Sequence, residues 1–339
     1  MPPSLADLTT LRLGGPIAAL TTAVTDDELI DAVRAADTAG ESVLLVGGGS
    51  NLVAADEGWP GRVILIRTRG ITLGHVGDHV RLTASAGEPW DALVRFTVAQ
   101  GWSGLETMAG IPGLTGATPV QNVGAYGAEI ADVITGLTVL DRQTGAVEAW
   151  TPEQCRFGFR TSVFKGTERY VVVDVTMSLT RRPESVPIRY AELARRLGVE
   201  PGRSAPLAAV RDAVLELRRT KGMVLDDADP DTWSVGSFFV NPLLDVVPDA
   251  AKDCPQWHTD GATKLSAAWL IERAGFQRGF GGPTASLSTK HTLALTNRGG
   301  ATTAQLLDLA REIQAGVQAR FDVRLRPEAR LAPNVPGLD

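Results

Sequence analysis

Cysteine and histidine are scarce in this chain of 339 residues, which has two cysteines and four histidines. Cys155 and Cys254 are too few for the disulfide framework that stabilises small secreted domains. The histidines do not show the spacing of metal ligands, so the sequence predicts no metal site. We therefore expect the fold to be held by an ordinary hydrophobic core, for which 339 residues are ample.

Long apolar runs and blocks of one charge sign are also missing. Apolar stretches such as residues 63–66 are far shorter than the ~20 residues of a membrane-spanning helix. The net charge is −6 and no basic run occurs, so nothing favours nucleic acid or a membrane surface as partner. The first residues lack the basic and apolar regions of a secretory signal. These absences together predict a cytoplasmic protein.

Glycine is plentiful, with 36 residues, and the pattern around it alternates between helix and strand signals. The length predicts about two domains. A capping box at Thr25 and Glu28 predicts a helix that ends at Gly40, and Pro89 predicts the first position of another. Further expected elements are a strand at 42–46, a hairpin of 137–140 with 147–150, a short helix from 151, a strand at 170–175, a mainly helical segment at 191–219 and a helix at 303–321.

Two glycine-rich segments are candidate binding loops. The run at 46–52 follows a strand directly, and its backbone amides could hold a phosphate, although an ordinary tight turn explains it equally well. It matches neither the dinucleotide fingerprint nor a P-loop. The second segment, 110–127, is long and irregular, which is typical of functional loops, and Gln121 and Asn122 offer amides to a flat polar ligand.

Three further segments carry reactive or charged groups. Arg160 lies among aromatic residues at 157–165, which favours either an anion site or a buried ion pair. Ser237 stands between a glycine and two phenylalanines, where it could donate a proton or simply bond to the backbone. Glu328 lies among three arginines at 324–330, a pattern typical of solvated salt bridges.

Taken in order, these segments resemble the UDP-N-acetylenolpyruvoylglucosamine reductase family, flavin enzymes of peptidoglycan precursor synthesis. The resemblance extends from about residue 10 to 330 and is carried by an ordered set of motifs. The matching stretches are 10–16, 47–52, 104–106, 111–113, 119–127, 159–165, 236–239, 264–271, Lys290-His291 with Asn297, and Pro327-Glu328.

The resemblance implies an α+β fold: a two-lobed FAD-binding domain of the PCMH type, as in vanillyl-alcohol-oxidase-like proteins, and a C-terminal α+β substrate-binding domain. The implied boundaries are 12–182 for the flavin domain, 183–225 for a helical insert that caps the substrate, and 226–335 for the C-terminal domain. The long insert resembles the larger form of the family, in which a loop tyrosine, here Tyr190, closes over the substrate. We expect a monomer.

The resemblance also implies the chemistry. NADPH reduces non-covalently bound FAD, which then reduces UDP-N-acetylglucosamine enolpyruvate to UDP-N-acetylmuramate. Arg160, Ser237 and Glu328 match the catalytic residues, with Ser237 as the proton donor and Arg160 as the cation that stabilises developing negative charge. The implied cofactor residues are Gly47, Gly48, Gly49, Ser50, Asn51, Leu52, Ile111, Pro112, Gly113, Gly116, Ala117, Gln121, Asn122, Gly124 and Ala125. The implied substrate residues are Tyr126, Tyr190, Arg218, Lys221 and Asn241.

One departure and two alternatives accompany this interpretation. Phe159 stands where better-studied members have tyrosine, so no phenolic hydroxyl adjoins Arg160. A flavin oxidase of the same fold is the first alternative, but no histidine precedes His75 to tether the flavin beside the glycine loop. The second is a non-catalytic flavin- or nucleotide-binding module, which would have no need of the matching catalytic residues.

Overall fold

The computed structural model describes residues 3–259 and 261–338, and this chain divides into two compact units. Unit 1 consists of the N-terminal residues up to Ile17, the stretch Gly49–Trp59 and the chain from Lys221 onward. Unit 2 consists of Ala18–Gly48 and Pro60–Thr220. The predicted flavin domain, insert and C-terminal domain are a division by function and stay a prediction. By compactness, residues 183–220 belong with the rest of unit 2.

The first part of unit 2 is a three-stranded sheet with one helix. The strands lie in the order β1 (Ile17–Ala23), β4 (Trp59–Ile66) and β2 (Val43–Val46), and β2 runs parallel to β4. Helix α1 (Asp26–Thr38) connects β1 to β2, as the capping box predicts, and the Thr25 side chain accepts a hydrogen bond from the Glu28 amide. The predicted helix and strand in this region are confirmed.

A larger antiparallel sheet makes up the second part of unit 2. Its strands are β5 (Ile71–Val76), β6 (His79–Ser85), β7 (Trp102–Ser103), β10 (Ile134–Asp141), β11 (Ala146–Trp150) and β12 (Tyr170–Arg181). The order is β11-β10-β12-β6-β5, and β7 pairs with β12. The predicted hairpin is β10 with β11, in which Leu137 faces Trp150.

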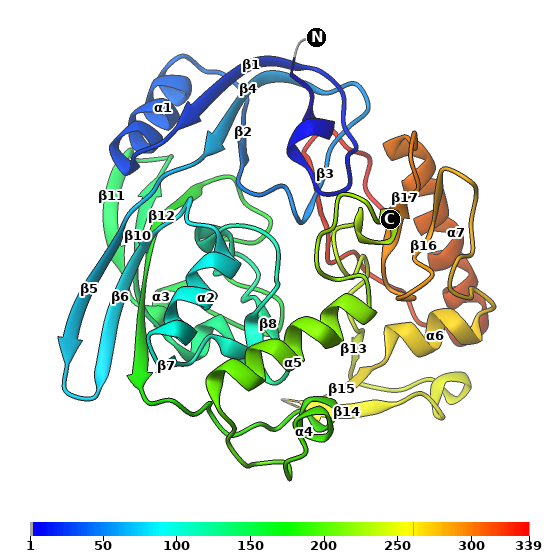
Figure 1. Ribbon diagram of the computed structural model, residues 1–339. Helices are drawn as coiled ribbons and strands as arrows, with labels where there is room; N and C mark the ends of the chain where they lie inside the picture. The colour runs from blue at the N-terminus through cyan, green and yellow to red at the C-terminus, as the bar shows by residue number, and fades with distance from the viewer. Residues whose placement is uncertain (1–2, 260, 339) are drawn as a thin grey trace. The chain divides into compact units, whose positions relative to one another are not determined.

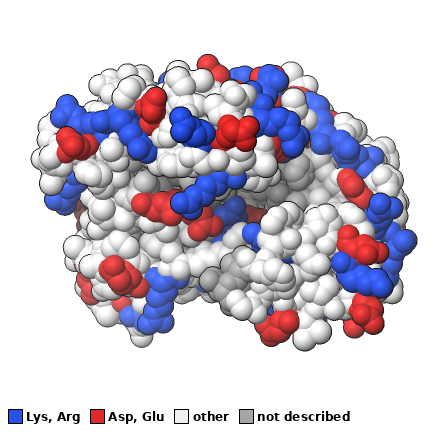
Figure 2. Space-filling view, turned by 90° about the horizontal axis from the view of Figure 1, so that it is seen from below, with Lys and Arg blue, Asp and Glu red and all other residues white. Residues whose placement is uncertain are grey.

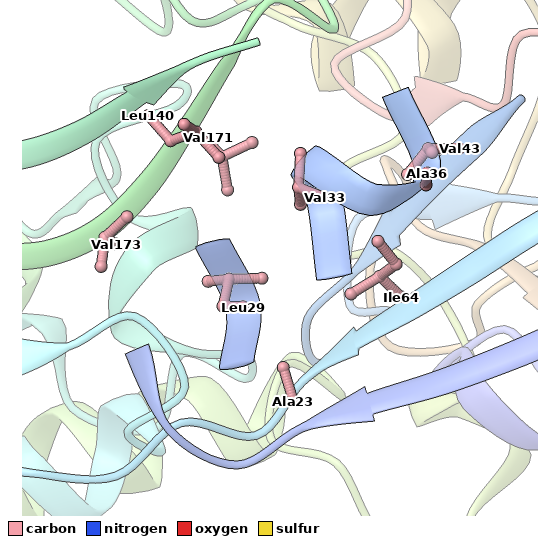
Figure 3. Close-up of a cluster of buried hydrophobic side chains, with 9 residues drawn as sticks. All are labelled: Ala23, Leu29, Val33, Ala36, Val43, Ile64, Leu140, Val171 and Val173. Carbon is pink, nitrogen blue, oxygen red and sulfur yellow. The ribbon is translucent and has the colours of Figure 1, made fainter. Parts of the chain in front are cut away.

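Helix α1 lies between the two sheets of unit 2, and its apolar face builds a core with both (Figure 3). The helix contributes Leu29 and Val33, which are fully buried. The small sheet and the strand leading into α1 contribute Ala23, Val43 and Ile64, and the large sheet contributes Leu140, Val171 and Val173. Because apolar residues recur every three to four positions, one helix face meets both sheets.

The remaining helices of unit 2 confirm the other helical predictions and correct the start of one helix. Helix α2 (Trp90–Ala99) starts one residue later than predicted, because Pro89 is its N-cap rather than its first residue. The segment 191–219 is two helices, α4 (Ala191–Leu197) and α5 (Leu207–Thr220), because Gly198 ends α4 in the left-handed conformation. The predicted short helix is α3 (Pro152–Cys155), with Thr151 as its N-cap.

Unit 1 has short strands and two helices. The strands are β3 (Leu52–Val53), β13 (Leu243–Leu244), β14 (Gln256–Thr259), β15 (Ala262–Leu265), β16 (Ala285–Leu287), β17 (Leu295–Asn297) and β18 (Arg330–Leu331), and the helices are α6 (Ala267–Arg273) and α7 (Thr303–Phe321) (Figure 1). Helix α7 has the predicted bounds, and the Asp56 carboxylate accepts hydrogen bonds from its first two amides. β3 pairs in parallel with β18, which ties residues 52–53 to residues 330–331.

Basic and acidic side chains are interspersed on the face shown in Figure 2, without a broad patch of either sign. Within residues 3–259 and 261–338, no helix has both the length and the apolar character needed to cross a membrane. The same part of the chain has no group of three His, Cys, Asp or Glu side chains arranged to hold a metal ion.

Candidate functional site

The end of the second glycine-rich segment folds into a very tight hairpin in unit 2. Strands β8 (Gly124–Ala125) and β9 (Ala128–Glu129) pair antiparallel across a two-residue turn of Tyr126 and Gly127. Both turn residues have positive φ, 52° and 88°, as a type I′ turn requires. Because tyrosine rarely adopts this conformation, the turn fixes Tyr126 in an unusual backbone geometry.

Arg160 lies in a second turn of unit 2 and reaches back to that segment. Gly158 and Thr161 close the turn by two backbone hydrogen bonds, and Arg160 has a φ of 53°. Its guanidinium donates from Nη2 to the Gly124 carbonyl at 2.6 Å and from Nη1 to the Asn122 carbonyl at 3.3 Å. The structure thus brings together two motifs that lie 36 residues apart in the sequence.

Asn122 is buried at the centre of this arrangement, with 1% of its surface exposed. Its side-chain Nδ2 donates to the Glu129 carboxylate at 2.7 Å and to the Gly158 carbonyl at 3.2 Å, and its Oδ1 accepts from the Ala131 amide. Both N–H groups and the oxygen therefore have partners within the chain. The predicted contact between Asn122 and a cofactor stays a prediction.

Three of the predicted substrate residues lie together in unit 2. The rings of Tyr126 and Tyr190 meet edge to face, with their centroids 5.3 Å apart, and Tyr190 is 43% exposed. Burial raises the pKa of Tyr126 to about 12, although the nearby Arg218 guanidinium acts against this rise. Burial also lowers the pKa of Arg218 below its usual value. A half-buried cation near a phenol ring can receive an anionic group such as a phosphate.

The glycines of the two binding loops allow backbone to approach backbone. A side-chain carbon at Gly48 would lie 2.7 Å from Gly113 Cα, and one at Gly116 would lie 2.4 Å from Ala86 Cβ. Any larger residue would push the two loops of unit 2 apart. Glycine-rich loops that pack backbone against backbone are typical of sites where main-chain amides approach a phosphate, so the residues present fit the pyrophosphate of FAD.

In unit 1, the segment that directly follows Ser237 is hydrogen-bonded to the segment that ends at Glu328. The backbone from Phe238 to Val240 runs antiparallel to residues 326–328: the Glu328 amide donates to the Phe238 carbonyl at 2.8 Å, and the Val240 amide donates to Arg326. The Asn51 side-chain amide reaches the Glu328 carbonyl at 3.5 Å, so the end of the first glycine loop adjoins the same strand. Arg324 and Arg326 are exposed, as expected of solvated arginines.

Other candidate residues of unit 1 have structural partners. The Asn241 side-chain oxygen accepts from the Ala267 amide at the start of α6. Lys290 forms a hydrogen-bonded ion pair with Asp229, which raises the pKa of Lys290, and His291 Nδ1 accepts from the Leu293 amide. The role of Lys221 and Asn241 in substrate binding stays a prediction.

Comparison with known proteins extends this picture to nearly the whole chain. Residues 17–149 match the model of the FAD binding domain, and residues 229–332 match the C-terminal domain of UDP-N-acetylenolpyruvoylglucosamine reductase. The reductase of Saccharopolyspora erythraea is 55% identical over 96% of this chain and 93% of its own length. The chain belongs to the UDP-N-acetylenolpyruvoylglucosamine reductase family.

Other members of the reductase family support the same conclusion. The reductase of Thermobifida fusca is 52% identical over 95% of this chain and 94% of its own length. The crystal structure of the reductase from Thermus caldophilus matches 98% of both chains with 28% identity and a TM-score of 0.68. The flavin fold implied by the sequence resemblance is therefore confirmed. The capping tyrosine loop and the individual site residues stay predictions.

Proposed function

We propose that this chain is a UDP-N-acetylenolpyruvoylglucosamine reductase, which reduces the enolpyruvyl ether of UDP-N-acetylglucosamine to UDP-N-acetylmuramate. Similarity to reductases over nearly the whole chain supports the proposal. The observation that carries it is Arg160, whose guanidinium is held by two carbonyls beside the hairpin of the glycine segment.

Bound FAD would supply the redox chemistry of the site, in which a hydride from NADPH is passed on to the terminal alkene carbon of the substrate. The amides around Gly48 and Gly113, where backbone packs against backbone, would hold the pyrophosphate of FAD. The rest of the predicted binding surface consists of residues 47–52 together with Ile111, Pro112, Gly113, Gly116, Ala117, Gln121, Asn122, Gly124 and Ala125.

Hydride addition leaves negative charge on the side of the substrate that bears the carboxylate. Arg160 meets this charge with a guanidinium that stays protonated and carries five N–H donors. The hydroxyl of Ser237 then donates a proton to the carbon next to the one that received the hydride, and the new lactyl group is complete. A hydroxyl serves this step well because it brings no negative charge to the anionic substrate before reaction.

Glu328 and the nucleotide-binding residues complete the proposal. Glu328 polarises the developing negative charge together with Arg160, which requires its carboxyl group to be protonated or hydrogen-bonded there. The nucleotide sugar is bound by Tyr126, Tyr190, Arg218, Lys221 and Asn241. We also propose that the protein is a monomer that acts in the cytoplasm and has neither a nucleic-acid nor a membrane partner, in keeping with its net charge of −6.

The experiment mixes purified protein with NADPH and the enolpyruvyl nucleotide under air. We expect NADPH oxidation that depends on the nucleotide, little peroxide, and a product heavier than the nucleotide by two hydrogens. Peroxide formed in proportion to the oxidation of an alcohol or sugar would instead indicate an oxidase. The absence of both activities from flavin-loaded protein would contradict the proposal.

A further inference from the structure

The carboxylate of Glu129 bridges two groups of the site in unit 2. Its Oε1 lies 3.5 Å from Nη1 of Arg160, and its Oε2 accepts a hydrogen bond from Nδ2 of Asn122 at 2.7 Å. Glu129 occupies β9, opposite Gly124, and the Gly124 carbonyl receives Nη2 of Arg160. One short hairpin therefore supplies both a carboxylate and a carbonyl to the same guanidinium.

The ion pair contributes little to folding. The Arg160 side chain is 21% exposed and the Glu129 side chain 36%, and partly exposed pairs of this kind are worth about 0–1 kcal/mol. The contact is also longer than a direct hydrogen bond. The ion pair by itself is thus a weak reason for placing a carboxylate here. The carboxylate also satisfies the buried Asn122 amide, a task that a neutral acceptor could perform equally well, so its negative charge is best explained by its effect on the direction of the guanidinium.

The backbone around this contact is held in unfavourable conformations. Asn122, Tyr126 and Arg160 all have φ between 46° and 53°, a left-handed region that residues other than glycine adopt only at an energetic cost. Such strain persists where surrounding contacts fix the backbone, and it gathers at functional sites. The hydrogen bonds of Asn122 and Arg160 are the contacts that fix it here.

We propose that Glu129 is a positioning residue that holds the Arg160 guanidinium in the orientation that receives the substrate carboxylate. This inference rests on the proposed function. Two carbonyls fix one part of the planar guanidinium, and the Glu129 carboxylate adds a third point that restricts its rotation. A cation held in advance stabilises developing charge without reorganising during the reaction.

The Glu129→Gln variant tests this role. Glutamine is nearly the same size as glutamate and can still accept a hydrogen bond from Asn122. Because it is neutral, it cannot form an ion pair with Arg160. We expect reduction of the bound flavin by NADPH at the wild-type rate and reoxidation by the enolpyruvyl nucleotide about 10- to 100-fold slower. The flavin absorption spectrum and the melting temperature should match those of the wild type.

Asp132→Asn is the matched control. Asp132 is an exposed carboxylate three residues away, and it accepts from the Glu129 backbone amide rather than contacting Arg160. Asparagine keeps an acceptor at that position, so we expect both half-reactions to run at wild-type rates. Glu129→Gln should also have little further effect in an Arg160→Ala background, because the group that it positions is then missing.

Three results would overturn the inference. Reoxidation of Glu129→Gln at the wild-type rate would mean that Arg160 needs no such partner. The same slowing in the presence and absence of Arg160 would mean that Glu129 acts by another route. Loss of flavin or a lower melting temperature would make Glu129 a structural residue. If the wild-type protein is reduced by NADPH but not reoxidised by the nucleotide, the proposed function fails and the inference fails with it.

Discussion

Units 1 and 2 each hold part of the predicted site, and each builds its part in a different way. In unit 2 the side chains of Asn122 and Arg160 bond to backbone carbonyls and hold three left-handed residues in place. In unit 1 the backbone is instead fixed by hydrogen bonds between residues 238–240 and 326–328. Glu328 therefore lies on a paired backbone, and Ser237 directly precedes the segment paired with it.

This difference predicts how the two regions respond to mutation. In the unit 2 region the buried Asn122 side chain is part of the framework, so changing it should affect both geometry and chemistry. Changing Ser237 or Glu328 leaves the backbone pairing of unit 1 in place, so chemistry alone should suffer. Comparing variants of the two regions in separate half-reactions is thus more informative than measuring turnover.

The largest effect is expected for Ser237→Ala. Reoxidation of the reduced flavin by the enolpyruvyl nucleotide should slow about 100- to 10,000-fold, because this step alone needs the donated proton. Reduction by NADPH should keep its wild-type rate, as stopped-flow absorbance of the flavin can measure. Equal slowing of both half-reactions would contradict the role assigned to Ser237.

Glu328→Gln should reduce turnover about 100-fold while the protein stays yellow. The Glu328 backbone amide that bonds to Phe238 is unchanged by this substitution, so the chain fold of unit 1 should persist. Steady-state rates and the flavin content after gel filtration provide the two measurements. Loss of bound flavin would make Glu328 a structural residue and remove the contrast between the two regions.

Gly48→Ala tests the contact between the loops in unit 2. The added carbon would lie 2.7 Å from Gly113 Cα, so we expect a loss of about 1–3 kcal/mol in the free energy of unfolding of the flavin-free protein. Gly47→Ala is the control, since its added carbon would make only an ordinary contact, 3.4 Å from Leu114. Denaturant unfolding should separate the two variants, and equal stability would refute the tight approach.

The smallest effect concerns Tyr126. Its pKa is raised to about 12, so this phenol should stay neutral while exposed tyrosines ionise near pH 10. The chain has three tyrosines, and Tyr126→Phe should remove the one that ionises at about pH 12 in an ultraviolet titration. The raised pKa favours the folded state below pH 10, and this contribution should fade between pH 10 and 12. Loss of a step near pH 10 would contradict the burial of Tyr126.

Regular elements were predictable from the sequence because their signals are local. The bounds of α7 follow from one capping residue and a continuous apolar stripe. The mainly helical character predicted for 191–219 is confirmed, but its division into two helices was not predicted; Gly198 adopts positive φ and ends α4. Apolar spacing alone gave no sign of that break.

The site was predictable residue by residue only through the family resemblance. The sequence marks Asn122 and Arg160 as candidates, but their hydrogen bonds depend on two turns whose ends lie far apart in the chain. Glu129 was missed because a single acidic residue after a glycine-rich segment has no distinctive pattern. A hairpin signal at Tyr126-Gly127, with Glu129 two residues beyond, could have placed it next to Gly124.

The most direct measurement of the central claim is a sequential stopped-flow experiment on the wild-type protein and Arg160→Ala. In the first mix NADPH bleaches the flavin, and in the second the enolpyruvyl nucleotide restores its absorbance. We predict that both proteins bleach at similar rates and that only the wild type recovers colour quickly. Equally fast recovery in Arg160→Ala, or no recovery in the wild type, would contradict the account.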